Sequence, residues 1–81
     1  MNTDEFKPHT TVDARELNCP LPVIRVKKAI TSVAVGEVLE IWTTDPGSIG
    51  DMAAWARATG QELVRMESAN APFKFWIRRQ R

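Results

Sequence analysis

The chain has 81 residues, with 11 lysine and arginine residues against 10 aspartate and glutamate residues. This length supports one small core but not two, and a net charge of +1 gives no overall field that favours nucleic acid or a membrane. One cysteine excludes an internal disulfide, and one cysteine with one histidine excludes a zinc site built from soft ligands.

The first ten residues are polar and aperiodic, and Pro8 interrupts them. They indicate a flexible leader over residues 1–10, with His9 as a solvated side chain, ahead of a single domain over residues 11–81. The N-terminus lacks the apolar core of a secretory signal, and no stretch reaches the about 20 apolar residues of a membrane span. We therefore expect a cytoplasmic protein, in which a free thiol stays reduced.

Along the domain, residues 11–14 alternate in polarity and predict a short strand. From residue 20 to residue 33 apolar residues recur at spacings of three and four, which predicts an amphipathic helix. Its inward side chains are Val23, Val26, Ile30 and Val33. Residues 37–44 then alternate with the two-residue period of a second strand.

A second helix and two further strands follow. After a turn at residues 45–47, Ser48 and Asp51 resemble a capping box that begins a second helix, which Gly60 ends. Its inner stripe is Ile49, Met52, Ala53 and Ala56. Residues 62–68 and 73–79 predict the third and fourth strands, joined by a turn at residues 70–72.

The order βαβαββ predicts an α+β fold, a two-layer α/β sandwich with a four-stranded mixed sheet and two helices on one face. The first two strands should be parallel because a helix joins them, so the turns that follow them emerge at one edge of the sheet. We therefore expect Cys19 and the turn at Asp45 to be neighbours in space.

Cys19 is followed by Pro20 and Pro22, an unusual setting for a thiol. Both prolines fit the first turn of a helix, so Cys19 is expected at the N-cap, with the free amides of Leu21 and Val23 directed at the sulfur. Such an environment lowers a thiol pKa from its ordinary value of about 8.5 and favours a nucleophile. The alternative is that Cys19 is a small buried apolar residue.

A reactive Cys19 has no second cysteine for dithiol chemistry, and His9 has no partner that would orient it as a catalytic base. The remaining role is a thiol that accepts a group and passes it to another protein.

Several positions of the chain together match one family pattern. They are Asp13, Arg15, Leu17, Cys19-Pro20-x-Pro22, Gly36-Glu37, Thr44-Asp45-Pro46, Asp51, Gly60-x-Glu62-Leu63 and the aromatic and basic last strand. On these positions the chain resembles the TusA/SirA family of small sulfur carriers over residues 11–80. One departure is Glu16, where the family more often has glycine.

The resemblance implies that Cys19 carries sulfane sulfur as a persulfide, without a cofactor. The donor would be a cysteine desulfurase or a rhodanese, and the acceptor a DsrE-like or other thiol-bearing protein. The sulfur would serve 2-thiouridine synthesis in tRNA or dissimilatory sulfur oxidation. Such a protein is a sulfurtransferase-type carrier that acts with partners, rather than a stand-alone enzyme.

Other motif positions are candidates for support of the thiol. Asp13 and Arg15 end the first strand near the turn, where an ion pair or hydrogen bonds could orient it, and a purely structural role is equally open. Asp45 and Asp51 are interpreted as turn and capping residues rather than acids.

A helical wheel places Leu21, Ile24, Arg25 and Lys28 on the outer side of the first helix, in a ridge that leads away from the thiol. We expect partners to dock on this ridge, although singly exposed apolar residues are common.

The rival hypothesis is a small RNA-binding or regulatory module. Trp42, Lys74, Trp76 and Arg78 are expected on the sheet face opposite the helices, and open sheets with aromatic and basic residues bind single-stranded RNA in several modules. The near-zero net charge makes direct nucleic-acid binding the weaker hypothesis.

Overall fold

A computed structural model describes residues 7–81 of the chain, so most of the expected leader lies outside the described residues. The elements follow one another as β1 (Thr10–Ala14), α1 (Leu21–Ala29), the short 3₁₀ helix η2 (Ile30–Ser32), β2 (Val38–Thr43), α2 (Gly47–Thr59), β3 (Glu62–Glu67) and β4 (Phe73–Arg78). The predicted order and fold class are confirmed, with boundaries that differ from the predicted ones by at most four residues.

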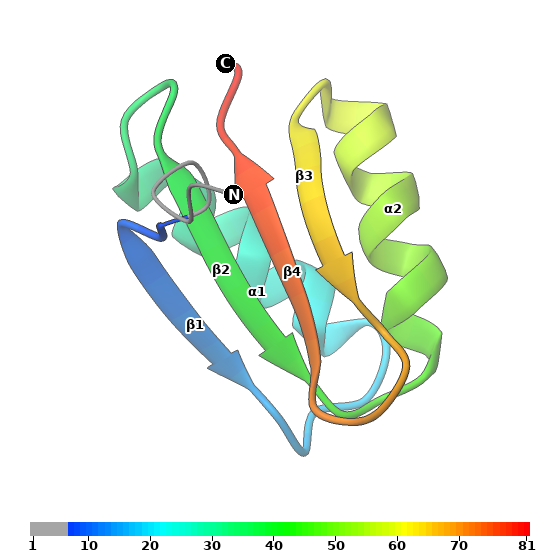
Figure 1. Cartoon of the computed structure of the whole chain (residues 1–81). Coiled ribbons are helices and arrows are strands. Elements are labelled where there is room, and N and C mark those ends of the chain that lie inside the picture. Colours follow the sequence, from blue (N-terminus) through cyan, green and yellow to red (C-terminus); the bar gives the residue numbers. More distant parts are fainter. Residues whose placement is uncertain (1–6) are drawn as a thin grey trace.

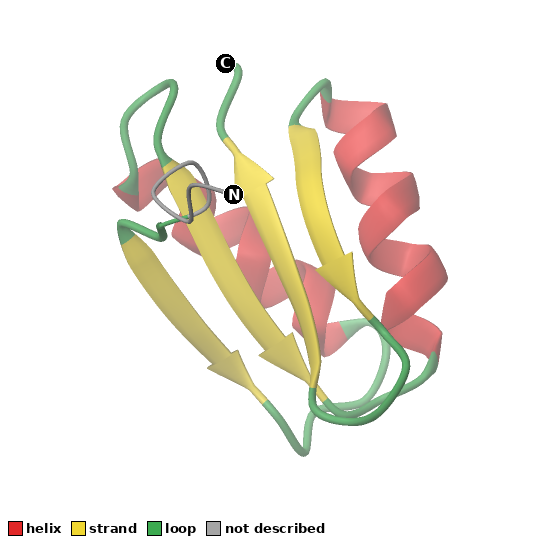
Figure 2. Cartoon of the chain, in the orientation of Figure 1, coloured by secondary structure: helices red, strands yellow, loops and turns green. Residues whose placement is uncertain are grey.

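The four strands form one mixed sheet in the order β1-β2-β4-β3 (Figure 1). β1 pairs parallel with β2, while β4 runs antiparallel to both β2 and β3. Both helical crossovers step in the same direction across the sheet, and right-handed connections then place both helices on one face. Figure 2 shows the helices behind the sheet and the other face open.

The core lies between the sheet and the helices. Buried side chains alternate along β4, whereas every residue of β2 except Trp42 is buried. Leu39 and Ile41 of β2 lie opposite Ile77 and Phe75 of β4 in the register. α1 contributes Val26 and η2 contributes Ile30, as the apolar spacing predicted. From α2, Met52 and Ala56 are buried, whereas Ile49 is only partly buried.

The sheet begins slightly earlier than the expected boundary between leader and domain. Thr10 belongs to β1, and the His9 backbone N–H donates to the Val38 carbonyl at 2.8 Å. The His9 Nδ1 accepts a second hydrogen bond from the Val38 N–H at 3.2 Å. His9 is exposed, but it extends the pairing of β1 with β2 instead of lying free in solvent.

The loop from β1 to α1 contains a left-handed residue, Glu16, with φ of 69°. Its backbone N–H donates to Thr44 Oγ1 at 2.9 Å, which ties this loop to the end of β2. A left-handed conformation is costly for residues with a Cβ and free for glycine. This geometry explains why the position that is Glu16 here favours glycine.

We expect Glu16→Gly to raise the free energy of unfolding by about 0.5–1 kcal/mol, because relief of left-handed strain exceeds the added entropy of the unfolded chain. Urea denaturation followed by tryptophan fluorescence measures the difference. Glu16→Ala is the matched control, since it removes the same side chain but keeps the strain. An equal gain in both variants would show that the side chain, not the backbone, is responsible.

Candidate functional site

Cys19 lies in the loop between β1 and α1. This loop is at the end of the sheet where the parallel strands β1 and β2 both finish (Figure 1). Its side chain is exposed, so the alternative of a buried apolar cysteine is wrong. The thiol is therefore accessible from outside the molecule.

The start of α1 differs from the prediction. The helix begins at Leu21, and Pro20, not Cys19, is the N-cap residue, with no side-chain capping bond. The Leu21 N–H donates to the Asn18 carbonyl at 2.9 Å, so this amide does not serve the sulfur. The peptide bond between Cys19 and Pro20 is cis.

Pro22 is fully buried, four residues before Val26 on the inner stripe of α1. The two prolines of the motif thus have different positions: Pro20 lies exposed in the turn, and Pro22 packs into the core. The start of the helix, and with it the loop that carries the thiol, is attached to the core through Pro22.

Two carboxylates form hydrogen bonds with Cys19, one from the turn before α2 and one from α2 itself. Asp45, in the turn after β2, accepts a hydrogen bond from the Cys19 backbone N–H at 2.7 Å through Oδ2. Asp51, in the second turn of α2, accepts one from the thiol itself, with 2.6 Å between Sγ and Oδ2. The predicted proximity of Cys19 to the Asp45 turn is confirmed.

The predicted capping box is wrong. α2 begins at Gly47 with Pro46 as N-cap and has no side-chain capping bond. Ser48 is buried, where its hydroxyl bonds the Asp45 carbonyl oxygen at 2.7 Å and the Thr43 hydroxyl at 2.6 Å. Asp51 is thereby left to face Cys19. Asp45 does act in its turn, because its Oδ1 accepts from the Gly47 N–H at 3.2 Å.

These carboxylates also reverse the expected shift of the thiol pKa. The hydrogen bond to Asp51 raises the pKa of Cys19 above its ordinary value, and partial desolvation and the negative charges of Asp51 and Asp45 act in the same direction. A lowered pKa was predicted from the helix terminus alone. Two anions close to the sulfur outweigh the dipole of α1, in which Pro22 has no N–H and the Leu21 N–H is already bonded to Asn18.

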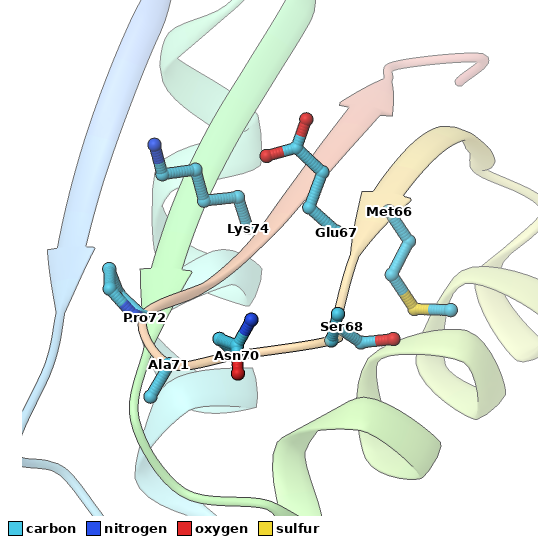
Figure 3. Close-up of a pocket in the computed structure, with 8 residues that line it drawn as sticks. Met66, Glu67, Ser68, Asn70, Ala71, Pro72 and Lys74 are labelled. Carbon is cyan, nitrogen blue, oxygen red and sulfur yellow. The ribbon is translucent and has the colours of Figure 1, made fainter.

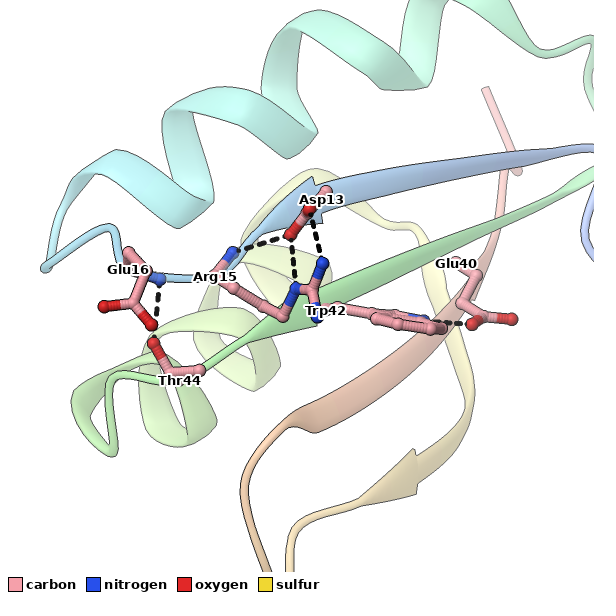
Figure 4. Close-up of polar contacts among 6 residues, drawn as sticks. All are labelled: Asp13, Arg15, Glu16, Glu40, Trp42 and Thr44. Carbon is pink, nitrogen blue, oxygen red and sulfur yellow. Dashed lines mark hydrogen bonds and ion pairs between the residues drawn. The ribbon is translucent and has the colours of Figure 1, made fainter.

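Asp13 and Arg15 bind one another rather than the thiol loop. The Arg15 guanidinium donates from Nε and Nη2 to the two carboxylate oxygens of Asp13, both at 2.9 Å (Figure 4). These bonds, with one from the Arg15 backbone N–H, lower the pKa of Asp13 to about 2. The guanidinium also lies 5.4 Å from the centre of the Trp42 ring. This pair fixes the end of β1 on the open face of the sheet.

The outer side of α1 is solvent-exposed as the helical wheel predicted. Leu21 is 47% exposed and Ile24 41% exposed, and Arg25 and Lys28 are exposed beside them. The helix contains no acidic residue. An apolar and basic surface therefore begins two residues after Cys19.

The open face of the sheet carries Trp42, Lys74, Trp76 and Arg78, as the alternation predicted. Cations of the same chain already cover the ring faces: Lys74 Nζ lies 4.6 Å from the Trp42 centroid, and the Arg65 guanidinium 5.6 Å from that of Trp76. The Trp42 indole N–H also donates to Glu40. A stacking base would have to displace these contacts, which weakens the RNA-binding hypothesis.

A pocket of about 540 Å³ lies at the turn between β3 and β4 (Figure 3). It is lined by Met66, Glu67, Ser68, Ala69, Asn70, Ala71, Pro72 and Lys74. Neither of the carboxylates that bond Cys19 lines this pocket, although the turn lies at the end of the sheet where β1 and β2 also end (Figure 1).

Within residues 7–81, no three or more histidine, cysteine or acidic side chains come together in a way that could hold a metal ion. In the same part of the chain, no helix has both the length and the apolar character needed to cross a membrane.

The fold and the site together define a small two-layer α+β protein that presents one accessible cysteine thiol beside two carboxylates. Comparison with known proteins is consistent with this class. Residues 10–79 match the family model described as sulfurtransferase TusA. A sulfur carrier protein TusA of Allochromatium vinosum is 43% identical over 68 residues, which are 84% of this chain and 90% of the relative.

Two further relatives extend the comparison. A putative sulfur carrier protein, YrkI of Bacillus subtilis, is 36% identical over 91% of this chain and 99% of its own length. The crystal structure of a SirA-like protein from Desulfitobacterium hafniense superposes with a TM-score of 0.74 at 27% identity, covering 89% of this chain and 99% of that one. The chain belongs to the TusA/SirA family of sulfur carrier proteins.

We expect Asp51→Asn to lower the thiol pKa, because it removes the nearest anion. Iodoacetamide labelling at pH 7 should then accelerate by about threefold for each unit that the pKa falls, since a tenfold gain in thiolate is partly offset by weaker nucleophilicity. Once the pH exceeds both pKa values the gain should turn into a loss of about threefold for each unit, because both thiols are then fully ionised and the variant thiolate is the weaker nucleophile. Glu16→Gln is the control, and equal acceleration in that variant would attribute the effect to net charge alone.

Proposed function

We propose that Cys19 accepts a sulfane sulfur as a persulfide from a donor protein and passes it to the thiol of an acceptor. The observation that carries this proposal is that the chain's one cysteine is exposed in a loop. The Asp45 carboxylate stabilises this loop by accepting a hydrogen bond from the Cys19 backbone N–H. The similarity of the chain to the sulfur carrier protein TusA of Allochromatium vinosum supports the proposal.

The transfer needs no cofactor and no net redox change. The Cys19 sulfur attacks the terminal sulfur of a donor persulfide, a new S–S bond forms, and the S–S bond of the donor breaks. The electron pair goes to the donor cysteine, which takes up the proton that Cys19 loses. In the second step an acceptor thiol attacks the terminal sulfur of the Cys19 persulfide. The Cys19 Sγ is the leaving group and takes up the proton that the acceptor thiol loses.

The donor in this proposal is a cysteine desulfurase or a rhodanese, and the acceptor is a DsrE-like or other thiol-bearing protein. The transferred sulfur would serve tRNA 2-thiouridine synthesis or dissimilatory sulfur oxidation. Both routes require the same exposed thiol, so the choice between them depends on which partners bind the carrier.

Partner recognition is assigned to the outer side of α1. Leu21 and Ile24 offer apolar contact area directly beside the thiol loop, and Arg25 and Lys28 add positive charge. A partner that binds here with an apolar patch and an acidic rim would bring its own cysteine to the edge of the sheet where Cys19 lies.

Incubation with a cysteine desulfurase and cysteine should add one sulfur to the wild-type protein, visible by intact mass and removed by reductant. Cys19→Ser is isosteric and should gain none. The sulfur-carrier proposal fails if the wild-type protein stays unmodified with both a desulfurase and a rhodanese donor, or if Cys19→Ser gains as much sulfur.

Reversal of charge at Arg25 and Lys28 to glutamate should slow loading by the donor protein about three- to tenfold at low salt, because favourable electrostatic steering is lost. Stopped-flow or quenched mass measurements give the rate. Arg57→Glu with Arg81→Glu makes the same change of charge at exposed positions outside α1 and serves as control. Equal slowing in both double variants would remove α1 as the docking surface.

A further inference from the structure

The hydrogen bond between Cys19 and Asp51 depends on what the sulfur carries. In the unloaded protein Sγ bears a proton and donates it to Asp51 Oδ2 at 2.6 Å. In a persulfide Sγ is bonded to carbon and to the second sulfur, so it has no proton to donate. Loading must therefore break this bond.

The contact with Asp45 behaves differently. Its partner is the Cys19 backbone N–H, at 2.7 Å, and this group is unchanged by loading. Asp45 holds the loop in both states, while Asp51 contacts only the atom that reacts. The two carboxylates are the charged groups that act on this sulfur, one from α2 and one from the turn before it.

Electrostatics adds to the difference between the two states. A persulfide is more acidic than a thiol, so the loaded carrier has an anionic terminal sulfur at neutral pH, close to the half-buried Asp51 carboxylate. The unloaded carrier instead has a neutral S–H, which the raised pKa of Cys19 maintains. Asp51 thus attracts the unloaded side chain and repels the loaded one.

We propose that Asp51 sets the sulfur-transfer equilibrium of the carrier, by stabilising the free thiol of Cys19 relative to its persulfide. The inference rests on the proposed persulfide chemistry at Cys19 and goes beyond it, because it assigns Asp51 a thermodynamic role. The carrier is biased towards giving sulfur away.

The equilibrium can be measured without either partner protein. Glutathione persulfide and the Cys19 thiol exchange to give the Cys19 persulfide and glutathione. The S–S bond of glutathione persulfide breaks, a bond forms between Sγ and the sulfane sulfur, and the proton of Sγ moves to the glutathione sulfur. The oxidation state of the transferred sulfur does not change.

Wild type and Asp51→Ala are equilibrated anaerobically at pH 7 with defined ratios of glutathione persulfide to glutathione, and the loaded fraction is read by intact mass. We expect the equilibrium constant for loading to be about three- to tenfold larger in Asp51→Ala, the range for one partly exposed charge-assisted hydrogen bond. Asp51→Asn should lie between them, because its amide oxygen is a weaker acceptor.

A pH series separates this role from a merely structural one. Above the thiol pKa the unloaded sulfur is an anion adjacent to Asp51, whereas the persulfide charge lies one atom further away. The difference between the variant and wild type should therefore shrink and reverse as the pH rises through the thiol pKa. A structural disturbance would not change sign with pH.

The controls keep the two proposals distinct. Glu16→Gln removes a carboxylate from the loop that contains Cys19 but leaves the hydrogen bond between the sulfur and Asp51 unchanged. The equilibrium constant for loading of this variant should match that of the wild type. Equal loading of wild type, Asp51→Ala and Asp51→Asn at every pH would overturn the role of Asp51 while leaving the carrier function intact. A wild-type protein that never loads, from glutathione persulfide or a donor protein, would instead overturn the carrier function itself.

Discussion

The parallel pairing of β1 with β2 is the constraint on which the rest of the site depends. It brings the ends of two strands, Ala14 and Thr43, into register at one edge of the sheet. The loops that leave these ends then meet, through Glu16 and Thr44 and through Cys19 and Asp45. Residues 26 positions apart in sequence become a hydrogen-bonded pair because a right-handed crossover fixes where each turn emerges.

Much of the fold could be predicted from the sequence because the signals were periodic. The alternation in β4 and the spacing of Val26, Ile30 and Val33 both follow from burial of one side of each element against a single core. The order of strands needed more information. β4 lies between β2 and β3, which depends on a long-range pairing that no local pattern encodes.

The site was predicted in part, for a similar reason. Topology alone placed Cys19 beside the Asp45 turn. The role of Asp51 was missed because a serine followed three residues later by an acid resembles a cap, whereas Ser48 faces inward to Thr43. The signal that could have found it is the position of Asp51 next to the buried stripe of Ser48, Met52 and Ala56, on a helix that packs against α1.

The thiol pKa is where local and tertiary effects oppose one another. A helix N-terminus favours a thiolate, but its field is weak and falls off within one turn, whereas a carboxylate in contact with the sulfur is a full charge. For an enzyme nucleophile a raised pKa would be a handicap. For a carrier it means that the free protein reacts slowly with adventitious electrophiles, which attack the thiolate.

Rate and equilibrium are therefore separate properties of this site. The rate of transfer depends on both proteins, because each supplies one of the two sulfur atoms between which the sulfane sulfur moves. The equilibrium between thiol and persulfide is a property of the free carrier, and it depends on the surroundings of Sγ and of the terminal sulfur in the two states. A partner can accelerate loading and discharge, but it cannot alter the preference for giving sulfur away that Asp51 is proposed to impose on the free carrier.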